Sequence, residues 1–250
     1  MMLGIIPARY ASSRLPGKPL ADIEGKSMIQ RVYEQATTSK FLNKVIVATD
    51  DKRIFDAVRE FTMDVVMTPD DIQTGSDRIA YVAANRTDAE IIVNIQGDEP
   101  FIPGTMIDQA LFPLLFDNSI QVSTLAKVIE SDVDLQNPSM VKVVLDSSNN
   151  ALYFSRSPIP FARDEQDKQL LLKQGSYLRH VGLYAYRRDA LFSFTKLAPS
   201  ILEQIEKLEQ LRMLENGIDI RVVTTDLESM AVDTPADLEQ ARHFARVHKL

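Results

Sequence analysis

Short runs of apolar residues alternate with amphipathic stretches along the first half of the chain. The apolar runs predict buried strands at residues 3–6, 44–48, 65–67 and 91–95. Apolar residues at helical spacing between these runs predict helices at about residues 28–36, 54–61 and 76–84. Continuous apolar strands separated by helices are typical of a parallel sheet that is covered on both faces. This half is therefore predicted to be Rossmann-like α/β.

From about Gln121 the pattern changes, because few helical stretches separate the apolar runs. Strands are predicted at residues 122–128, 141–145, 152–154, 181–186 and 220–224. Residues 146–150 form a turn signal, and residues 163–174 are predicted to be a polar loop. Helices are predicted at residues 201–214, opened by a capping box, and from Pro235 onward. We expect one domain over residues 1–250 with an inserted, partly antiparallel region at about 121–190. The predicted fold is a mostly parallel mixed sheet flanked by helices.

Composition narrows the class of protein. Hydrophobic residues make up 45% of the chain and charged residues 25%, as in ordinary globular proteins. The chain contains no cysteine, which excludes disulfides, thiolate catalysis and Cys-ligated zinc. No apolar run is long enough to span a bilayer, and the start lacks a signal-peptide pattern, so we expect a cytoplasmic protein without membrane partners. A net charge of −7 disfavours nucleic acid as a partner.

The basic residues gather in one place, the loop that follows the first predicted strand. Arg9, Arg14 and Lys18 lie along it, with the small residues Ser12 and Ser13 between them. Ligands of open α/β sheets bind at the carboxyl ends of strands, and these cations suit phosphate oxygens. The loop is neither a P-loop, because proline follows the lysine, nor a dinucleotide-binding loop, because no G-x-G-x-x-G is present. We predict a polyphosphate site here; a solvated basic loop is the alternative.

Two aspartates follow short predicted strands elsewhere in the chain. Asp98 stands in the string QGDEP, and Asp233 stands in VDTPAD. Thr234 and Asp237 match the capping residues of the last predicted helix, which leaves the carboxylate of Asp233 for another task. Mg²⁺ typically uses one or two carboxylates together with substrate phosphates. Carboxylates at these strand ends are therefore candidates for binding Mg²⁺, with a role in turns or caps as the alternative for Asp98; Glu99 is not assigned as a ligand.

The second half carries a further group of polar residues on its predicted strands. Arg156 ends one strand, where a surface ion pair is the alternative to ligand binding. Strand alternation places His180, Gly182, Tyr184 and Tyr186 on one face of another. An imidazole beside tyrosine hydroxyls suits a polyhydroxylated ligand, although a lone histidine is more often structural.

Several of these strings together resemble one known family. The loop PARYASSRLPGKPL, the strings QGDEP and VDTPAD, and the later strings YFSR, RHVGLYAYR and LEQLR are similar to those of 3-deoxy-manno-octulosonate (Kdo) cytidylyltransferases, which are sugar nucleotidyltransferases. The resemblance runs from Ile5 to about Ala241. Ser27 departs from the family, where proline is common, and it is predicted to cap a helix instead.

The resemblance implies roles for individual residues. It implies catalytic roles for Arg9, Lys18, Asp98 and Asp233, the two aspartates as Mg²⁺ ligands. It implies that the nucleotide is bound by Arg9, Ser12, Ser13, Arg14, Lys18, Gln73, Ser76 and Arg78. For Arg78, surface solvation is the alternative. It implies that the acidic sugar is bound by Gln96, Arg156, His180, Tyr184, Glu209 and Gln210. Exposed helix polarity is the alternative for Glu209 and Gln210.

The resemblance also implies the reaction. CTP and Kdo would give CMP-Kdo and pyrophosphate for lipopolysaccharide biosynthesis, in a homodimer. Three alternatives remain open: CMP activation of a related acidic sugar such as amino-Kdo or sialic acid, a non-catalytic nucleotide-sugar sensor, and a nucleic-acid-binding module. The number of Mg²⁺ ions is also left open.

Overall fold

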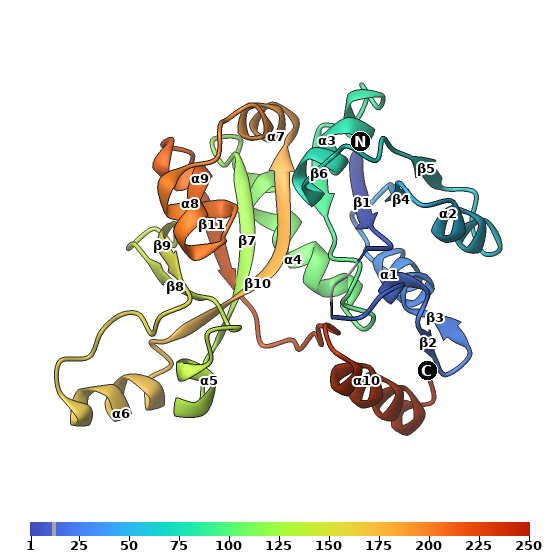
Figure 1. Ribbon diagram of the computed structural model, residues 1–250. Coiled ribbons are helices and arrows are strands. Elements are labelled where there is room, and N and C mark those ends of the chain that lie inside the picture. The colour runs from blue at the N-terminus through green and yellow to red at the C-terminus, as the bar shows by residue number, and fades with distance from the viewer. Residues whose placement is uncertain (12–13) are drawn as a thin grey trace. The chain divides into compact units, whose positions relative to one another are not determined.

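Two compact units make up the chain in a computed structural model that describes residues 1–11 and 14–250, with the side chain of residue 165 left out (Figure 1). The first unit comprises residues 1–108 and 228–250, and the second comprises residues 109–227. Both are built from helices and one sheet portion, which confirms the predicted α/β class. The predicted single domain with an insertion at about 121–190 stays a prediction.

The first unit is built on four parallel strands, in the order β6-β1-β4-β5 (Figure 1). They are β1 (Met2–Ala8), β4 (Lys44–Thr49), β5 (Val65–Met67) and β6 (Ile91–Asn94). A two-stranded hairpin, β2 (Asp22–Ile23) with β3 (Lys26–Ser27), lies apart from this sheet. Most residues of β1, β4 and β6 are buried, as in a parallel sheet that is covered by helices. Burial of their apolar side chains stabilises the sheet. All four predicted strands are confirmed.

The α-helices of the first unit begin at polar capping residues. They are α1 (Met28–Ala36), α2 (Lys52–Arg59), α3 (Gly75–Ala84) and α10 (Pro235–His248), with a short 3-10 helix, η1 (Lys18–Leu20). Ser27 accepts a hydrogen bond from the backbone N–H of Gln30 at the start of α1, which confirms its predicted role. Thr234 and Asp237 form the predicted capping box of α10.

The second unit has β7 at the centre of its sheet portion. This strand pairs antiparallel with β10 and parallel with β11, while β8 pairs antiparallel with both β10 and β9. The strands are β7 (Val122–Val128), β8 (Lys142–Leu145), β9 (Ala151–Ser155), β10 (Leu178–Arg187) and β11 (Ile220–Thr224). The predicted partly antiparallel arrangement is therefore confirmed. The predicted turn between β8 and β9 is present, with the carboxylate of Asp146 accepting from the backbone N–H groups of Ser148 and Asn150.

Two sequence predictions in this unit are wrong. Residues 163–174 are not a polar loop, because α6 (Glu165–Lys173) forms there and packs Leu172 against Ile129, Leu135 and Tyr177. The predicted helix at residues 201–214 is two helices, α8 (Ile201–Glu206) and α9 (Gln210–Glu215). Lys207 ends α8 in a left-handed conformation with φ of 56°, which interrupts the helical hydrogen bonds.

Three further helices were not predicted. They are α4 (Gly104–Phe116), α5 (Asp132–Gln136) and α7 (Arg188–Thr195). The sequence of α4 is apolar around most of its circumference and contains Pro113, so that no amphipathic stripe identifies it. Among the helices of residues 1–11 and 14–250, none is long and apolar enough to cross a membrane.

Candidate active site

The loop after β1 turns back on itself before η1. The backbone N–H of Gly17 donates to the carbonyl oxygen of Tyr10 at 3.1 Å, and Gly17 has a φ of +69° that favours glycine. The guanidinium of Arg53, from α2, lies 3.3 Å from the centre of the Tyr10 ring. These contacts hold the two ends of the basic loop together. Ser12 and Ser13, which were predicted to contact the nucleotide, lie outside the described residues.

Lys18, Asp98 and Asp233 meet in one cluster. The Lys18 Nζ atom lies 2.7 Å from Asp98 Oδ2 and 3.0 Å from Asp233 Oδ1. Burial alone would lower the pKa of Lys18, but the two carboxylates outweigh this effect and raise the pKa above its usual value. Arg14 extends the cluster, with a guanidinium nitrogen 3.2 Å from Asp233 Oδ2. The structure thus brings together four predicted site residues.

Close backbone packing places the two carboxylates. A Cβ atom at Gly97 would lie 2.8 Å from the carbonyl oxygen of Pro7, so only glycine allows the segment after β6 to approach the end of β1. The backbone N–H of Val232 donates to the carbonyl oxygen of Asp98 at 2.9 Å, which ties the two acidic segments to each other. Asp237 accepts from the backbone N–H of Asp233, so that the Asp233 carboxylate itself remains directed to the cations.

The two aspartates suit a divalent cation. Among the described residues there is no group of three or more His, Cys, Asp and Glu side chains that could hold a metal ion. Mg²⁺ does not require such a cage, because it is commonly held by one or two carboxylates and substrate phosphates. Both carboxylates already converge on the positive charge of Lys18. Glu99 is buried and accepts from the Ser229 hydroxyl at 2.5 Å.

A second group of charges surrounds Asp50, at the end of β4. The guanidinium of Arg78 is fully buried and lies 2.5 Å from Asp50 Oδ2, and it also donates to the hydroxyl of Thr68. Arg9 lies 3.7 Å from the same carboxylate oxygen and donates to the carbonyl oxygen of Gln73 at 2.6 Å. Surface solvation, the alternative considered for Arg78, is therefore wrong: the side chain is an internal ion-pair partner.

Ser76 lies in the first turn of α3 and is buried. Thr74, immediately before this helix, caps it by accepting from the backbone N–H of Asp77 at 3.0 Å. Gln96 follows β6, in the first unit, two residues before Asp98. The contacts of Ser76 and Gln96 with ligands stay predictions.

In the second unit, Arg156 is anchored by backbone carbonyl groups. Its guanidinium donates to the carbonyl oxygens of Glu206 at 2.8 Å, Pro138 at 3.0 Å and Lys207 at 3.4 Å. The ammonium of Lys142, which is fully buried, donates to the carbonyl oxygen of Arg156 itself at 2.6 Å. The side chain is therefore held at the C-terminus of α8 and is not a simple surface ion pair.

His180 and Tyr184 lie side by side on β10, within a row of rings. The ring centres of His180 and Tyr184 are 5.2 Å apart, and Phe154 and Tyr186 extend the row on either side. The pairing with β7 shifts between Val181 and Tyr184, so strand alternation is interrupted there. His180 and Tyr184 nevertheless share a face, as predicted. Burial lowers the pKa of His180 to about 3, so its ring is neutral at physiological pH.

Glu209 and Gln210 lie at the N-terminal end of α9. Gln210 is buried, so exposed helix polarity does not explain it. Glu209 is partly exposed, with its carboxylate 4.0 Å from the guanidinium of Arg212. Their contacts with a sugar stay predictions.

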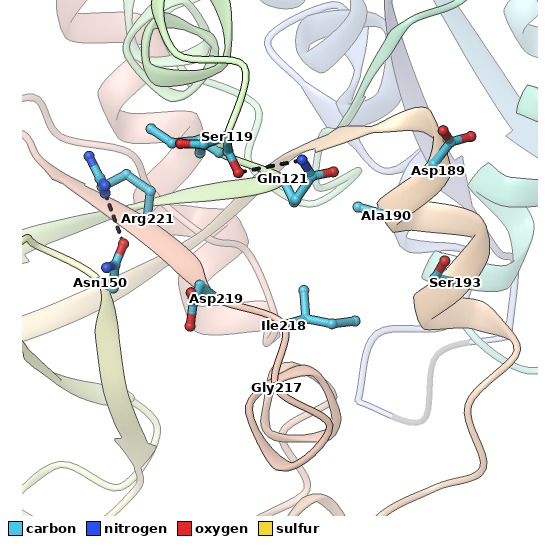
Figure 2. A pocket seen from close by; sticks show the side chains of 11 residues that line it. Ser119, Gln121, Asn150, Asp189, Ala190, Ser193, Gly217, Ile218, Asp219 and Arg221 are labelled. Carbon is cyan, nitrogen blue, oxygen red and sulfur yellow. Dashed lines mark hydrogen bonds between the residues drawn. The ribbon is translucent and has the colours of Figure 1, made fainter.

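A cavity of about 510 Å³ lies elsewhere in the second unit (Figure 2). It is lined by residues that precede β7 and β11 and by residues of α7, among them Gln121, Asp219 and Ser193. Figure 2 shows Arg221 donating to the side-chain oxygen of Asn150 at its edge. None of the residues predicted to bind a ligand lines this cavity.

Sequence reasoning missed three residues that contact predicted site residues. Asp50 pairs with Arg9 and Arg78, Lys142 donates to the carbonyl oxygen of Arg156, and Thr124 Oγ1 lies 2.9 Å from His180 Nε2. Asp50 follows β4 directly, as Asp98 follows β6 closely, so the same strand-end signal could have found it. Lys142 and Thr124 lie inside apolar runs, where nothing in the pattern marks them.

A family model described as cytidylyltransferase matches residues 3–220. The chain belongs to the cytidylyltransferase family. The matched residues of this cytidylyltransferase include the basic loop and Asp98, and they end before Asp233.

Individual relatives extend the match over nearly the whole chain. The 3-deoxy-manno-octulosonate cytidylyltransferase of Geobacter metallireducens is 54% identical over 94% of this chain and 94% of its own. That of Chloroherpeton thalassium is 49% identical over 95% of each. A solved structure of CMP:2-keto-3-deoxy-manno-octonic acid synthetase complexed with CTP is 44% identical, with a TM-score of 0.91 over 100% of this chain and 99% of that one.

The fold itself extends to more distant proteins. A 4-diphosphocytidyl-2C-methyl-D-erythritol synthase from Anaerococcus prevotii has a TM-score of 0.63 at 12% identity, covering 98% of this cytidylyltransferase and 96% of that chain. At this identity the likeness concerns the fold alone.

Proposed function

We propose that this cytidylyltransferase transfers CMP from CTP to the anomeric hydroxyl of Kdo, giving CMP-Kdo and pyrophosphate. The observation that carries the proposal is the 54% identity, over nearly the full length of both chains, to relatives named for this activity. The likeness to a synthetase solved with CTP supports the same nucleotide. The product would enter lipopolysaccharide biosynthesis. We propose a homodimer on the resemblance alone, and a cytoplasmic location on the sequence pattern given above.

The cations of the basic loop would hold the triphosphate. Arg14 and Lys18 are paired with Asp233 and Asp98, so each can exchange a carboxylate partner for a phosphate oxygen. Arg9 is oriented by Asp50 and by the Gln73 carbonyl, with its side chain 39% exposed and accessible to a ligand. Phosphoryl transfer of this kind depends on positioning and charge neutralisation, and no covalent intermediate on the protein is needed.

The carboxylates of Asp98 and Asp233 would hold Mg²⁺ in this scheme. When bound, Mg²⁺ neutralises phosphate charge and lowers the pKa of a hydroxyl that attacks the α-phosphorus. The two side chains supply no proton acceptor of their own to the reaction while both are paired with cations. Their role is to fix positive charge where the nucleotide and the attacking hydroxyl meet.

Arg156 has donors left for the carboxylate of the sugar. A guanidinium group carries five N–H bonds, and three acceptors of the second unit each use one. The remaining two can meet a carboxylate, and the carbonyl contacts reduce the entropy that the side chain loses on binding. The arginine is thus pre-ordered for an anionic ligand.

Replacing Arg156 by alanine is expected to raise the KM for Kdo by roughly 10- to 150-fold, because a charge-assisted hydrogen bond contributes about 1.5–3 kcal/mol. The KM for CTP should change by less than about threefold, since the loop after β1 holds the triphosphate. Arg163→Ala is the matched control, because it removes an exposed arginine of the same unit. Steady-state kinetics with each substrate varied separately measure both effects. Equal defects toward both substrates would contradict the assignment of Arg156.

Pyrophosphate release tests the proposed function itself. The protein is mixed with CTP and Mg²⁺, and with Kdo, amino-Kdo or sialic acid in separate reactions. Kdo should give the highest kcat/KM, and CTP should be preferred over the other nucleoside triphosphates. Faster release with sialic acid or amino-Kdo would assign a different acidic sugar. Binding of CTP and Kdo without pyrophosphate release would indicate a non-catalytic sensor and contradict the proposal.

A further inference from the structure

The hydroxyl of Thr124, on β7, faces three polar atoms at once. Its Oγ1 atom lies 2.8 Å from the carbonyl oxygen of Leu183, 3.2 Å from that of Val181 and 2.9 Å from His180 Nε2. Thr124 is fully buried, so water does not supply alternative partners. The two carbonyl groups belong to the interrupted pairing of β10, where two residues are not matched by β7.

Counting protons decides the direction of these hydrogen bonds. A threonine hydroxyl has one hydrogen to donate, and carbonyl oxygens only accept. If the hydroxyl donated to His180, its lone pairs would face the Leu183 carbonyl at 2.8 Å, and a buried carbonyl would lose its donor. If the hydroxyl donates to Leu183, it can accept from a protonated Nε2 of His180, and neither the Leu183 carbonyl nor the Nε2 atom is left without a partner.

We infer that Thr124 holds His180 in the tautomer with the proton on Nε2 and thereby leaves Nδ1 as a hydrogen-bond acceptor for a hydroxyl of the sugar. The role toward the sugar rests on the proposed function, whereas the tautomer follows from the contacts of β7 and β10 alone. Among the described residues no hydrogen bond to His180 Nδ1 competes with a ligand. Thr124 is a positioning residue in this scheme, because it acts through His180 and does not itself touch the sugar.

The surroundings of the His180 ring restrict its orientation and its protonation state. Phe154 and Tyr184 flank the imidazole, with ring centres 5.0 and 5.2 Å away, so the ring has little room to turn over. Desolvation keeps the ring neutral at physiological pH, and a neutral imidazole has one donor and one acceptor nitrogen. A ligand group that meets Nδ1 must then be a donor, as a sugar hydroxyl is and an ether or a carboxylate is not.

Nitrogen-15 NMR of the protein labelled on its histidines reads the tautomer directly. The chain has three histidines, and the ring signals that vanish in His180→Gln are those of His180. We expect a protonated Nε2 and a bare Nδ1 at pH 7.5 in the unliganded wild-type protein. A protonated Nδ1 in that protein would overturn the inference, whatever the enzyme's substrate proves to be.

Two substitutions of Thr124 test its part. Thr124→Ser keeps the hydroxyl and should keep both the NMR signature and the kinetics. Thr124→Val is nearly isosteric but lacks the hydroxyl; His180 should then populate both tautomers, and the KM for Kdo should rise by about 3- to 10-fold with the KM for CTP unchanged. An unaltered tautomer in Thr124→Val would overturn the role of Thr124. If Thr124→Val does not fold, the wild-type spectrum still tests the tautomer of His180. A changed tautomer in Thr124→Ser would also contradict the role of Thr124. Absence of turnover in the wild-type protein would refute the proposed function without touching the tautomer.

Discussion

Replacing Asp98 or Asp233 by asparagine is expected to lower kcat by more than about a hundredfold, because each change removes one negative charge from the predicted metal site. Asparagine has nearly the same shape, so the packing around Gly97 and the capping box of α10 should persist. Pyrophosphate release at saturating CTP and Kdo measures the loss. Asp88→Asn, an exposed aspartate of the same unit, is the matched control and should leave the rate unchanged.

A second measurement separates metal binding from the pairing with Lys18. Binding of Mn²⁺ to the protein with CTP, followed by electron paramagnetic resonance, should weaken in both variants and not in Asp88→Asn. A wild-type rate in a folded Asp233→Asn variant would remove this residue from the site. Normal Mn²⁺ binding with a slow rate would instead assign the two aspartates to the positioning of Lys18.

Arg78→Ala should lower the free energy of unfolding by about 3–5 kcal/mol, since it leaves the largely buried Asp50 carboxylate with only the longer contact to Arg9. Arg78 is fully buried, and the side chain of Asp50 is only 13% exposed. Denaturant unfolding followed by circular dichroism measures the change. Lys52→Ala, which breaks an exposed pair with Asp56, should cost less than about 1 kcal/mol.

The double variant Asp50→Ala and Arg78→Ala gives the prediction a further check. With both charges gone, no unpaired buried charge remains, so the double variant should be less destabilised than the sum of the two single changes. Additive losses would mean that Arg78 and Asp50 contribute independently. Kinetics of Asp50→Ala should show a raised KM for CTP, because Arg9 loses the carboxylate that orients it.

The sequence predicted the parallel sheet of the first unit well because its strands are buried on both faces. In β6 (Ile91–Asn94) the first three residues are apolar, and short apolar runs separated by helical stretches are typical of a parallel sheet. Capping residues marked the starts of α1 and α10 equally clearly, since their side chains bond to the local backbone. Local causes leave local signals in the sequence.

Helices that depend on tertiary packing were harder to predict. In α6, the first five of nine residues are charged or amide residues, and the packing of Leu172 onto Tyr177 becomes evident only in three dimensions. The break after α8 rests on a left-handed lysine, Lys207, where glycine or asparagine would have been the usual signal.

In the candidate site, too, residue types could be predicted from the sequence, whereas contacts between distant segments could not. Arg14, Lys18 and the strand-end aspartates could be proposed from the sequence because their residue types suit phosphate and Mg²⁺. That Lys18 would lie between Asp98 and Asp233 could not be predicted, since 215 positions separate the lysine from the second aspartate. The burial of Arg78 was missed for the same reason: its partner Asp50 comes from another strand end, and sequence spacing does not reveal that contact.

The discontinuous first unit has a consequence for how the protein is made. Lys18 and Asp98 leave the ribosome before residues 109–227, whereas Asp233 follows all of them. Chains fold from the N-terminus as they are synthesised. The ion pair of Lys18 and Asp98 can therefore form while Asp233 is still untranslated. The cluster of Lys18, Asp98 and Asp233 is completed only when the last segment docks, with the backbone N–H of Val232 donating to the carbonyl oxygen of Asp98. A ribosome that stalls within the second unit therefore releases a chain without the second carboxylate, and such a fragment is expected to leave the cellular CTP pool untouched.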